Sequence, residues 1–233
     1  MKKTILVSII LLSGCYSLAQ PKRGSMFIGG KISSSKTKIP MSLTNNSSNN
    51  ISGLSISPNL GYFLSNKLAL VLEMSYSTDK VDNSVINYTV TSITNYKSYN
   101  YMASLFVRYY RAISDKLYFS LNNGIGFYQF DSKNEVTNID VINNKTSSKT
   151  TTEKINSYTI NISPGLDYFI APHWGLRTTI GSMEYSINSQ KSNNGNIQKS
   201  NNFSLNTSII NLTSLTITLN YFFDSKNEVA ESD

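Results

Sequence analysis

Residues 101–110 read YMASLFVRYY, and their pattern predicts the architecture of the chain. Apolar residues recur at every second position, which is the period of a β-strand with two unlike faces. Between them stand Ser104 and Arg108, which need a polar or paired environment. One face of this strand is therefore predicted to meet an apolar phase, and the other a polar interior. The residues of the apolar face are Tyr101, Ala103, Leu105, Val107 and Tyr109.

The same alternation recurs along the chain, between connections of two kinds. Three connections are short, whereas four are long and rich in Asn, Ser, Thr and Lys, and long irregular links are unusual in a compact soluble domain. Seven links join eight strands, so we predict an antiparallel up-and-down barrel with short turns at one end and long loops at the other. The short links lie at residues 65–67, 113–116 and 172–173, and the long ones at 36–50, 80–98, 132–154 and 188–202.

Two hairpins begin with similar sequences, SPNLGYFL at residues 57–64 and SPGLDYFI at residues 163–170. A barrel assembled from repeated hairpins is expected to show such a sequence similarity between its hairpins. Pro58 and Pro164 would each delete one hydrogen bond from a strand ladder. We therefore expect an irregular strand at both positions.

Aromatic residues gather near the short turns and the end of the last strand. Tyr and Trp favour a membrane–water interface, because their rings are apolar and carry a polar tip. This placement favours a membrane barrel, with its apolar face toward lipid, over a soluble barrel or sandwich with the apolar face in a core. The predicted aromatic girdle at the short-turn end comprises Tyr62, Tyr109, Tyr168, Trp174, Tyr221 and Phe223.

Four charged residues fall on the predicted inner face: Glu73, Arg108, Asp167 and Arg177. An eight-stranded barrel is just wide enough inside for its own side chains, so buried charges must pair. Asp167 and Arg177 lie nearly symmetrically about Pro172 and are expected to face each other across one hairpin. We predict a packed interior charge network, and weigh against it an ion-conducting pore or proton relay.

The N-terminus is predicted to be a signal peptide, residues 1–19, because a basic start precedes an apolar run too short to span a bilayer. Cleavage between Ala19 and Gln20 fits the small residues before it, and the alternative is a lipobox with lipidation at Cys15. The barrel domain is expected over residues 20–223, followed by a short periplasmic tail at 224–233.

The composition argues against several functions. The net charge of +7 is scattered rather than clustered, which disfavours a nucleic-acid surface. The only histidine, His173, falls in a short turn as an expected exposed residue, so neither a Ser–His pair nor a metal site can be built on it. No catalytic residue, cofactor or metal ion is predicted.

The chain resembles the small eight-stranded outer-membrane barrels, in particular the family described as the outer membrane protein β-barrel domain. The resemblance spans residues 25–223 and includes the last strand, LTITLNYFF at 215–223, which is similar to the family's C-terminal assembly signal. It implies location in the bacterial outer membrane, contact with outer-membrane lipids, and handling by the barrel-assembly machinery. We also expect a monomer.

The resemblance is architectural and leaves the function open. The first hypothesis is a non-enzymatic outer-membrane protein with a structural role or with loops that contact a surface ligand. The alternatives are a narrow porin-like channel and a soluble or lipid-anchored β-barrel binding protein.

Overall fold

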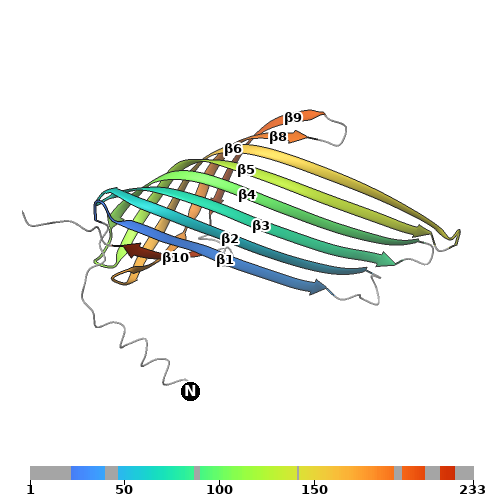
Figure 1. Ribbon diagram of the computed structural model, residues 1–233, viewed down its shortest axis with the longest axis horizontal. Helices are drawn as coiled ribbons and strands as arrows, with labels where there is room; N and C mark the ends of the chain where they lie inside the picture. Colours follow the sequence, from blue (N-terminus) through green and yellow to red (C-terminus); the bar gives the residue numbers. More distant parts are fainter. Residues whose placement is uncertain are drawn as a thin grey trace, which may run out of the picture.

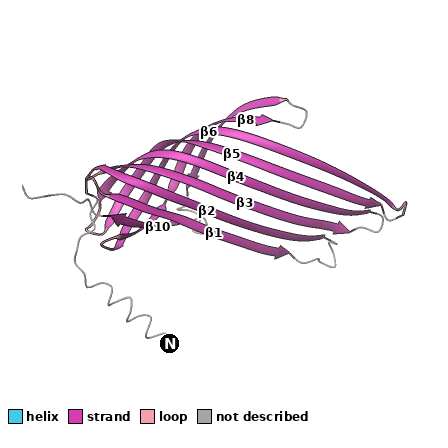
Figure 2. Ribbon diagram, viewed as in Figure 1, coloured by secondary structure: helices cyan, strands magenta, loops and turns pink. Residues whose placement is uncertain are grey.

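The computed structural model describes residues 22–39, 47–86, 90–140, 142–191, 196–207 and 216–223. Within these ranges the regular elements are all β-strands (Figure 2). No helix there is long and apolar enough to cross a membrane. The strands are β1 (Met26–Ile39), β2 (Ser47–Ser65), β3 (Leu68–Ile86), β4 (Val90–Ala112), β5 (Leu117–Asp140), β6 (Lys145–Ala171), β7 (Trp174–Thr179), β8 (Gly181–Lys191), β9 (Ile197–Thr207) and β10 (Thr216–Phe223).

The strands close into a barrel (Figure 1). Each strand from β1 to β7 pairs antiparallel with the next, β7 pairs with β10, and β10 pairs back with β1. The predicted all-β antiparallel barrel is confirmed. Eight strands form this ring among the described residues, and the β8–β9 hairpin continues the wall along residues 154–162 in the middle of β6.

The described residues form ten strands rather than the eight predicted, because two predicted strands are divided. After the turn at residues 172–173, Ile180 separates β7 from β8, and its N–H donates to the carbonyl of Pro164 at 3.0 Å. Pro164 has no N–H to donate in return, so the ladder is interrupted there. Pro58 interrupts the β2–β3 ladder in the same way. The residues between β9 and β10 lie outside the described ranges.

The long connections also differ from expectation, because most of their described residues are paired strand. β5 and β6 pair as far as Asp140 with Lys145, and β3 and β4 as far as Ile86 with Thr91. β6 is 27 residues long, whereas about 9–11 residues of a tilted strand span a bilayer. Both faces of these extensions are polar, so the sequence shows no apolar alternation, although Thr, Val and Ile retain a high β-propensity.

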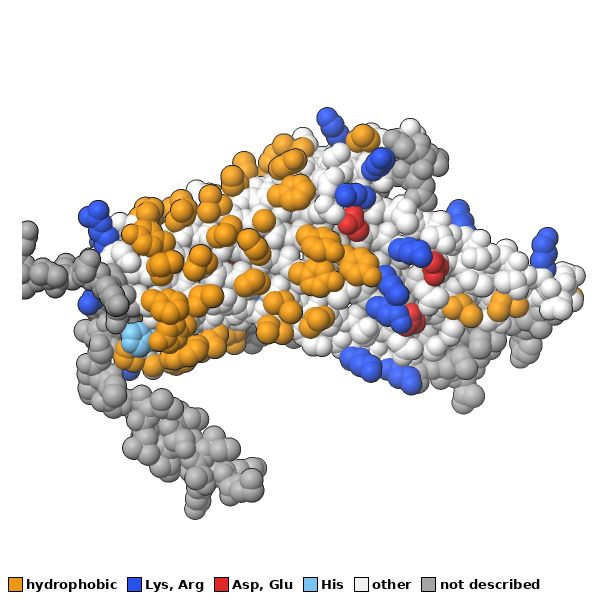
Figure 3. All heavy atoms as spheres, in the orientation of Figure 1, with side chains coloured by type: hydrophobic (Ala, Val, Ile, Leu, Met, Phe, Trp, Pro, Cys, Tyr) orange, Lys and Arg blue, Asp and Glu red, His pale blue; other side chains and the backbone are white. Residues whose placement is uncertain are grey.

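The outer surface carries a broad apolar belt on the half of the barrel nearest the short turns (Figure 3). Leu70, Leu105 and Ile160 point outward and are 38%, 44% and 55% exposed. Their inward neighbours are buried, as Val71 and Phe106 illustrate. The alternation in the sequence thus separates an apolar exterior from a packed interior.

Candidate functional site: the barrel interior

Asp167 of β6 and Arg177 of β7 meet inside the barrel as direct partners across the hairpin. Arg177 Nη1 lies 3.0 Å from Asp167 Oδ2, and the two side chains are 4% and 3% exposed. Ser120 of β5 completes the group: its hydroxyl donates to Asp167 Oδ2 and accepts from Arg177 Nη1 at 2.5 Å. Three strands are thereby joined by charge-assisted hydrogen bonds, which are stronger than neutral ones.

Arg108 of β4 lies in the same section of the barrel with partners of its own. Its Nε donates to Asn122 Oδ1 at 2.7 Å and its Nη1 to the Tyr110 hydroxyl at 3.2 Å. The guanidinium carbon also lies 5.4 Å from the centroid of the Phe27 ring, within the range of a cation–π contact. These contacts stabilise a buried positive charge that has no direct ion pair with any residue in the described ranges.

Glu73, the fourth predicted member, pairs with a different residue. Its carboxylate lies 3.6 Å from the ammonium group of Lys31 in β1, and both side chains are partly exposed. Lys31 was not predicted, although it falls on the inward face of β1 together with Phe27. The predicted single network is thus two groups, one deeply buried and one partly exposed.

Beside the buried charges, at the short-turn end, inward-facing aromatic rings fill the barrel. Phe222 of β10 is central, with its ring centroid 4.9 Å from that of Phe169 and 5.2 Å from that of Phe27. Further rings pack around these three. We call this cluster the aromatic plug: Phe27, Phe63, Tyr110, Tyr118, Phe169 and Phe222.

The aromatic plug was not predicted, because the aromatic residues near the short turns were considered only as a girdle at the membrane interface. The signal was nevertheless present. Tyr62–Phe63, Tyr109–Tyr110 and Tyr168–Phe169 are adjacent pairs, and neighbouring residues of a strand point to opposite faces. One aromatic of each pair therefore has to face the interior.

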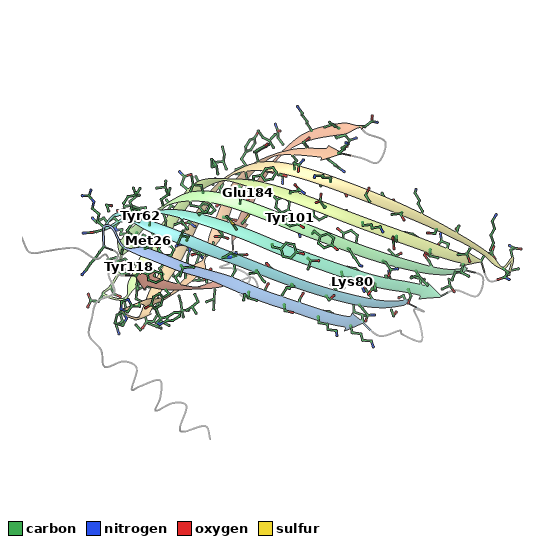
Figure 4. All side chains as sticks on the ribbon, viewed as in Figure 1. Met26, Tyr62, Lys80, Tyr101, Tyr118 and Glu184 are labelled. Atoms are coloured by element: carbon green, nitrogen blue, oxygen red, sulfur yellow. The ribbon has the colours of Figure 1, made fainter. Side chains whose placement is uncertain are left out.

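The other member of each pair lies on the outer surface. Tyr62, labelled in Figure 4, is 46% exposed. Tyr221 is half-buried, because its ring packs 5.0 Å from both Trp174 and Phe223. The structure places every residue of the predicted girdle outward near the short turns: Tyr62, Tyr109, Tyr168, Trp174, Tyr221 and Phe223.

His173 is less exposed than expected and is held by β10. Its Nδ1 lies 2.9 Å from the carbonyl oxygen of Phe222, and its ring stacks on Tyr221 with centroids 5.6 Å apart. The backbone carbonyl of His173 accepts a hydrogen bond from Phe222 N at 2.8 Å. These contacts join the β6–β7 turn to the last strand.

The described part of the chain contains no cluster of three His, Cys, Asp or Glu side chains suited to a metal ion. Ser120 is fully buried, so the Ser120–Asp167–Arg177 group offers no hydroxyl to a substrate. The predicted cleavage between Ala19 and Gln20, the candidate lipidation at Cys15 and the tail 224–233 lie outside the described residues.

Comparisons with known proteins found similar solved structures and one matching family model. A search of curated proteins found no match. Solved structures with similar folds include OprG of Pseudomonas aeruginosa, with 12% identity, 89% of this chain and 99% of that chain covered, and a TM-score of 0.46. Ail of Yersinia pestis has 12% identity, with 86% of this chain and 99% of that chain covered, and a TM-score of 0.32. A major outer membrane protein of Thermus thermophilus is also similar, with 11% identity, 86% of this chain and 100% of that chain covered, and a TM-score of 0.38.

Since each of these TM-scores is below 0.5, the structural similarities carry no weight in assigning the chain. The family model for the outer membrane protein β-barrel domain matches residues 5–223, which is nearly the entire sequence. The chain therefore belongs to the outer membrane protein β-barrel domain family, and it is an integral protein of the bacterial outer membrane.

Proposed function

We propose that this protein is a non-enzymatic barrel with a closed interior, which supports the envelope and presents its polar strand extensions at the cell surface. The observation that carries the proposal is the burial of side chains across the short-turn half. Phe27 and Phe63 are 0% exposed, and Arg108 is 2% exposed although it carries a charge. A water-filled pore at this level would wet these side chains.

Conductance in planar lipid bilayers tests the closed interior. The refolded wild-type barrel is expected to pass almost no current, because the aromatic plug and the buried charges fill its section. Phe222→Ala removes the central ring of the plug and is expected to produce openings. Phe203→Ala is the matched control, since Phe203 is 61% exposed on β9 and contributes nothing to the plug. Sustained wild-type current would instead establish the porin-like alternative.

The proposal also includes the absence of lipid-modifying activity. His173 is engaged by the backbone and ring of β10 at the short-turn end, which is the periplasmic end in this family. Mass spectra of lipid A from cells with wild-type protein, His173→Ala protein or no protein are expected to be identical. A lipid A species that depends on His173 would overturn this part of the proposal.

A further inference from the structure

We propose that the outer face of β3, β4, β5, β6 and β8 carries a specific site for one outer-leaflet lipid, with phosphate groups bound by lysines and acyl chains held in an apolar groove below. The lysines are Lys80, Lys97, Lys133, Lys154 and Lys191, here called the lysine row. This site is independent of the closed interior.

The strand register places the lysines side by side. Lys80 is the direct partner of Lys97, and Lys97 is the direct partner of Lys133. On the same surface, Lys154 is the direct partner of Lys191. Like charges directly opposite each other destabilise a sheet, because their Cβ atoms are only about 4.5–5.5 Å apart. Three such pairs on one face indicate that the charges serve a purpose other than folding.

All five side chains point outward and are exposed, as Figure 4 shows for Lys80. Lys80 pairs with Asp82 at 2.6 Å and Lys133 with Glu135 at 2.5 Å, and each acid lies two residues along the same strand. Among the described residues, Lys97, Lys154 and Lys191 make no ion pair. The row thus keeps an excess of positive charge, although Asp131 lies beside Lys154.

Two of the unpaired lysines also face a hollow in the surface. A pocket of about 490 Å³ lies between β4, β5, β6 and β8 and is lined by Tyr99, Lys133, Lys154 and Lys191, with Asp131 and Glu153 as its acidic members. Because the Lys133 ammonium group is paired with Glu135, Lys154 and Lys191 are the ammonium groups that this pocket can present to a ligand. A phosphate group is the complementary ligand, because ammonium groups bind phosphate as strong point charges.

Directly toward the membrane on the same strands lies an apolar groove of about 530 Å³. Ala103 leaves space among larger neighbours, since its direct partners are Met74 and Phe127. Phe127 and Tyr158 form one wall with ring centroids 5.4 Å apart. Further lining residues are Leu105, Ile125 and Ile187.

The spacing between groove and lysines fits one lipid. Lys154 precedes Tyr158 by four residues on β6, and Lys97 precedes Ala103 by six on β4, which corresponds to about 13–20 Å along a strand. An acyl chain has a similar length. The ring pair Tyr76–Tyr101, with centroids 5.3 Å apart, lies between the two levels, where Tyr marks a membrane interface. Figure 3 shows basic side chains beyond the apolar belt on this face.

Native mass spectrometry of the full barrel in zwitterionic micelles, titrated with bis-phosphorylated lipid A, tests the site. Lys97→Gln/Lys133→Gln is expected to weaken binding roughly 30-fold, on the basis of the usual contribution of a lysine at an anionic membrane surface. Lys36→Gln/Lys38→Gln is the matched control, because these exposed β1 lysines face Ser52 and Asn50 rather than other lysines. The control is expected to bind like wild type.

Three further measurements separate the specific site from general electrostatic attraction. Ala103→Phe fills the groove without changing charge and is expected to weaken lipid A binding, whereas dephosphorylated lipid A is expected to bind poorly to the wild type. Inorganic phosphate at millimolar concentration is expected not to displace bound lipid A. Equal losses in the two lysine variants, or undiminished binding in Ala103→Phe, would overturn the proposal.

The row also predicts a separable effect on stability. In lipid-free zwitterionic micelles, Lys97→Gln is expected to raise the unfolding midpoint, since it relieves repulsion from both Lys80 and Lys133. Gel mobility with and without boiling reports folding of every variant. A lower midpoint for Lys97→Gln would show that the row stabilises the sheet itself, and would remove the argument for a bound phosphate.

Discussion

Arg177 and Asp167 face each other across the β6–β7 hairpin, and their ion pair is almost sealed from water at an Nη1–Oδ2 distance of 3.0 Å. In the low dielectric of the interior, removing one partner would leave the other as an uncompensated buried charge, which is strongly destabilising. The pair holds β6 to β7 beside the aromatic plug, and Ser120 extends it to β5. The stability of the short-turn half is therefore concentrated in a few buried groups.

Asp167→Asn is expected to reduce the free energy of unfolding by about 3–5 kcal/mol, because it leaves Arg177 charged and buried without a counter-ion. Urea titration of the refolded barrel, followed by the fluorescence of Trp174, measures the loss. Glu73→Gln serves as the control: its pair with Lys31 is longer and partly exposed, so the expected loss is about 1 kcal/mol or less. Similar losses in the two variants would contradict the account of the interior.

Gly61→Ala is expected to destabilise the barrel by about 1–3 kcal/mol through overpacking. A Cβ at this position would clash with Cε1 of the Phe27 ring, inside the plug. Phe27→Leu in the same chain is expected to recover part of the loss. At Gly53 the added Cβ would meet the flexible end of Asp79, so Gly53→Ala should cost less in the same urea titration. A larger loss of stability in Gly53→Ala than in Gly61→Ala would show that the plug is loosely packed.

The sequence predicted the barrel but not the extent of its strands. YMASLFVRYY and its counterparts alternate because one face meets lipid and the other a filled interior. At residues 132–154 both faces are polar, so composition suggested a loop where β5 and β6 remain paired. Sequence periodicity reveals a strand only where its two faces differ in polarity, so it does not reveal the polar extensions of β5 and β6.

The candidate site was predictable in part for the same reason. The facing of Asp167 and Arg177 follows from their symmetry about a short turn. The pairing of Glu73 with Lys31 depends on the register of β1 with β2 and of β2 with β3. These two residues are more than forty positions apart in the sequence, so no local pattern indicates their contact. The lysine row likewise becomes visible only when the register aligns Lys80, Lys97 and Lys133.

The turn between β5 and β6 is expected to be pH-sensitive through Asp140. Its carboxylate accepts hydrogen bonds from Asn143 N and Ile142 N, each at 3.0 Å, and from Asn143 Nδ2 at 2.8 Å. These bonds hold the pKa of Asp140 below its ordinary value, with the Asn143 backbone bond as the largest cause. A lowered folded-state pKa stabilises the turn fully above the unfolded-state value of about 3.9, and the stabilisation is lost as the pH falls through the folded-state pKa.

Hydrogen exchange at the Asn143 amide measures this dependence. Protection is expected to be constant at neutral pH and to fall only under acidic conditions. In Asp140→Asn the carboxylate is absent, so the pH dependence should disappear. An acid-insensitive Asn143 amide in the wild type would contradict the assignment.

The strand extensions are expected to be dispensable for folding. Asn134 and Thr151 are direct partners in the β5–β6 ladder, so residues 135–150 can be replaced by an Asn-Gly turn that closes the shortened hairpin. The shortened barrel keeps the apolar belt, the plug and the buried charges. It should therefore remain heat-modifiable on gels, whereas failure to fold would show that the extension is part of the folding unit.

The most direct test is a spin-label scan of residues 101–110 in the barrel reconstituted in lipid bilayers, with accessibility to oxygen and to a water-soluble nickel complex measured at each position. Labels at Ala103, Leu105 and Val107 should be accessible to oxygen, and labels at Ser104, Phe106 and Arg108 to neither reagent. Accessibility of the second set to the nickel complex would reveal a water-filled lumen and contradict a closed interior.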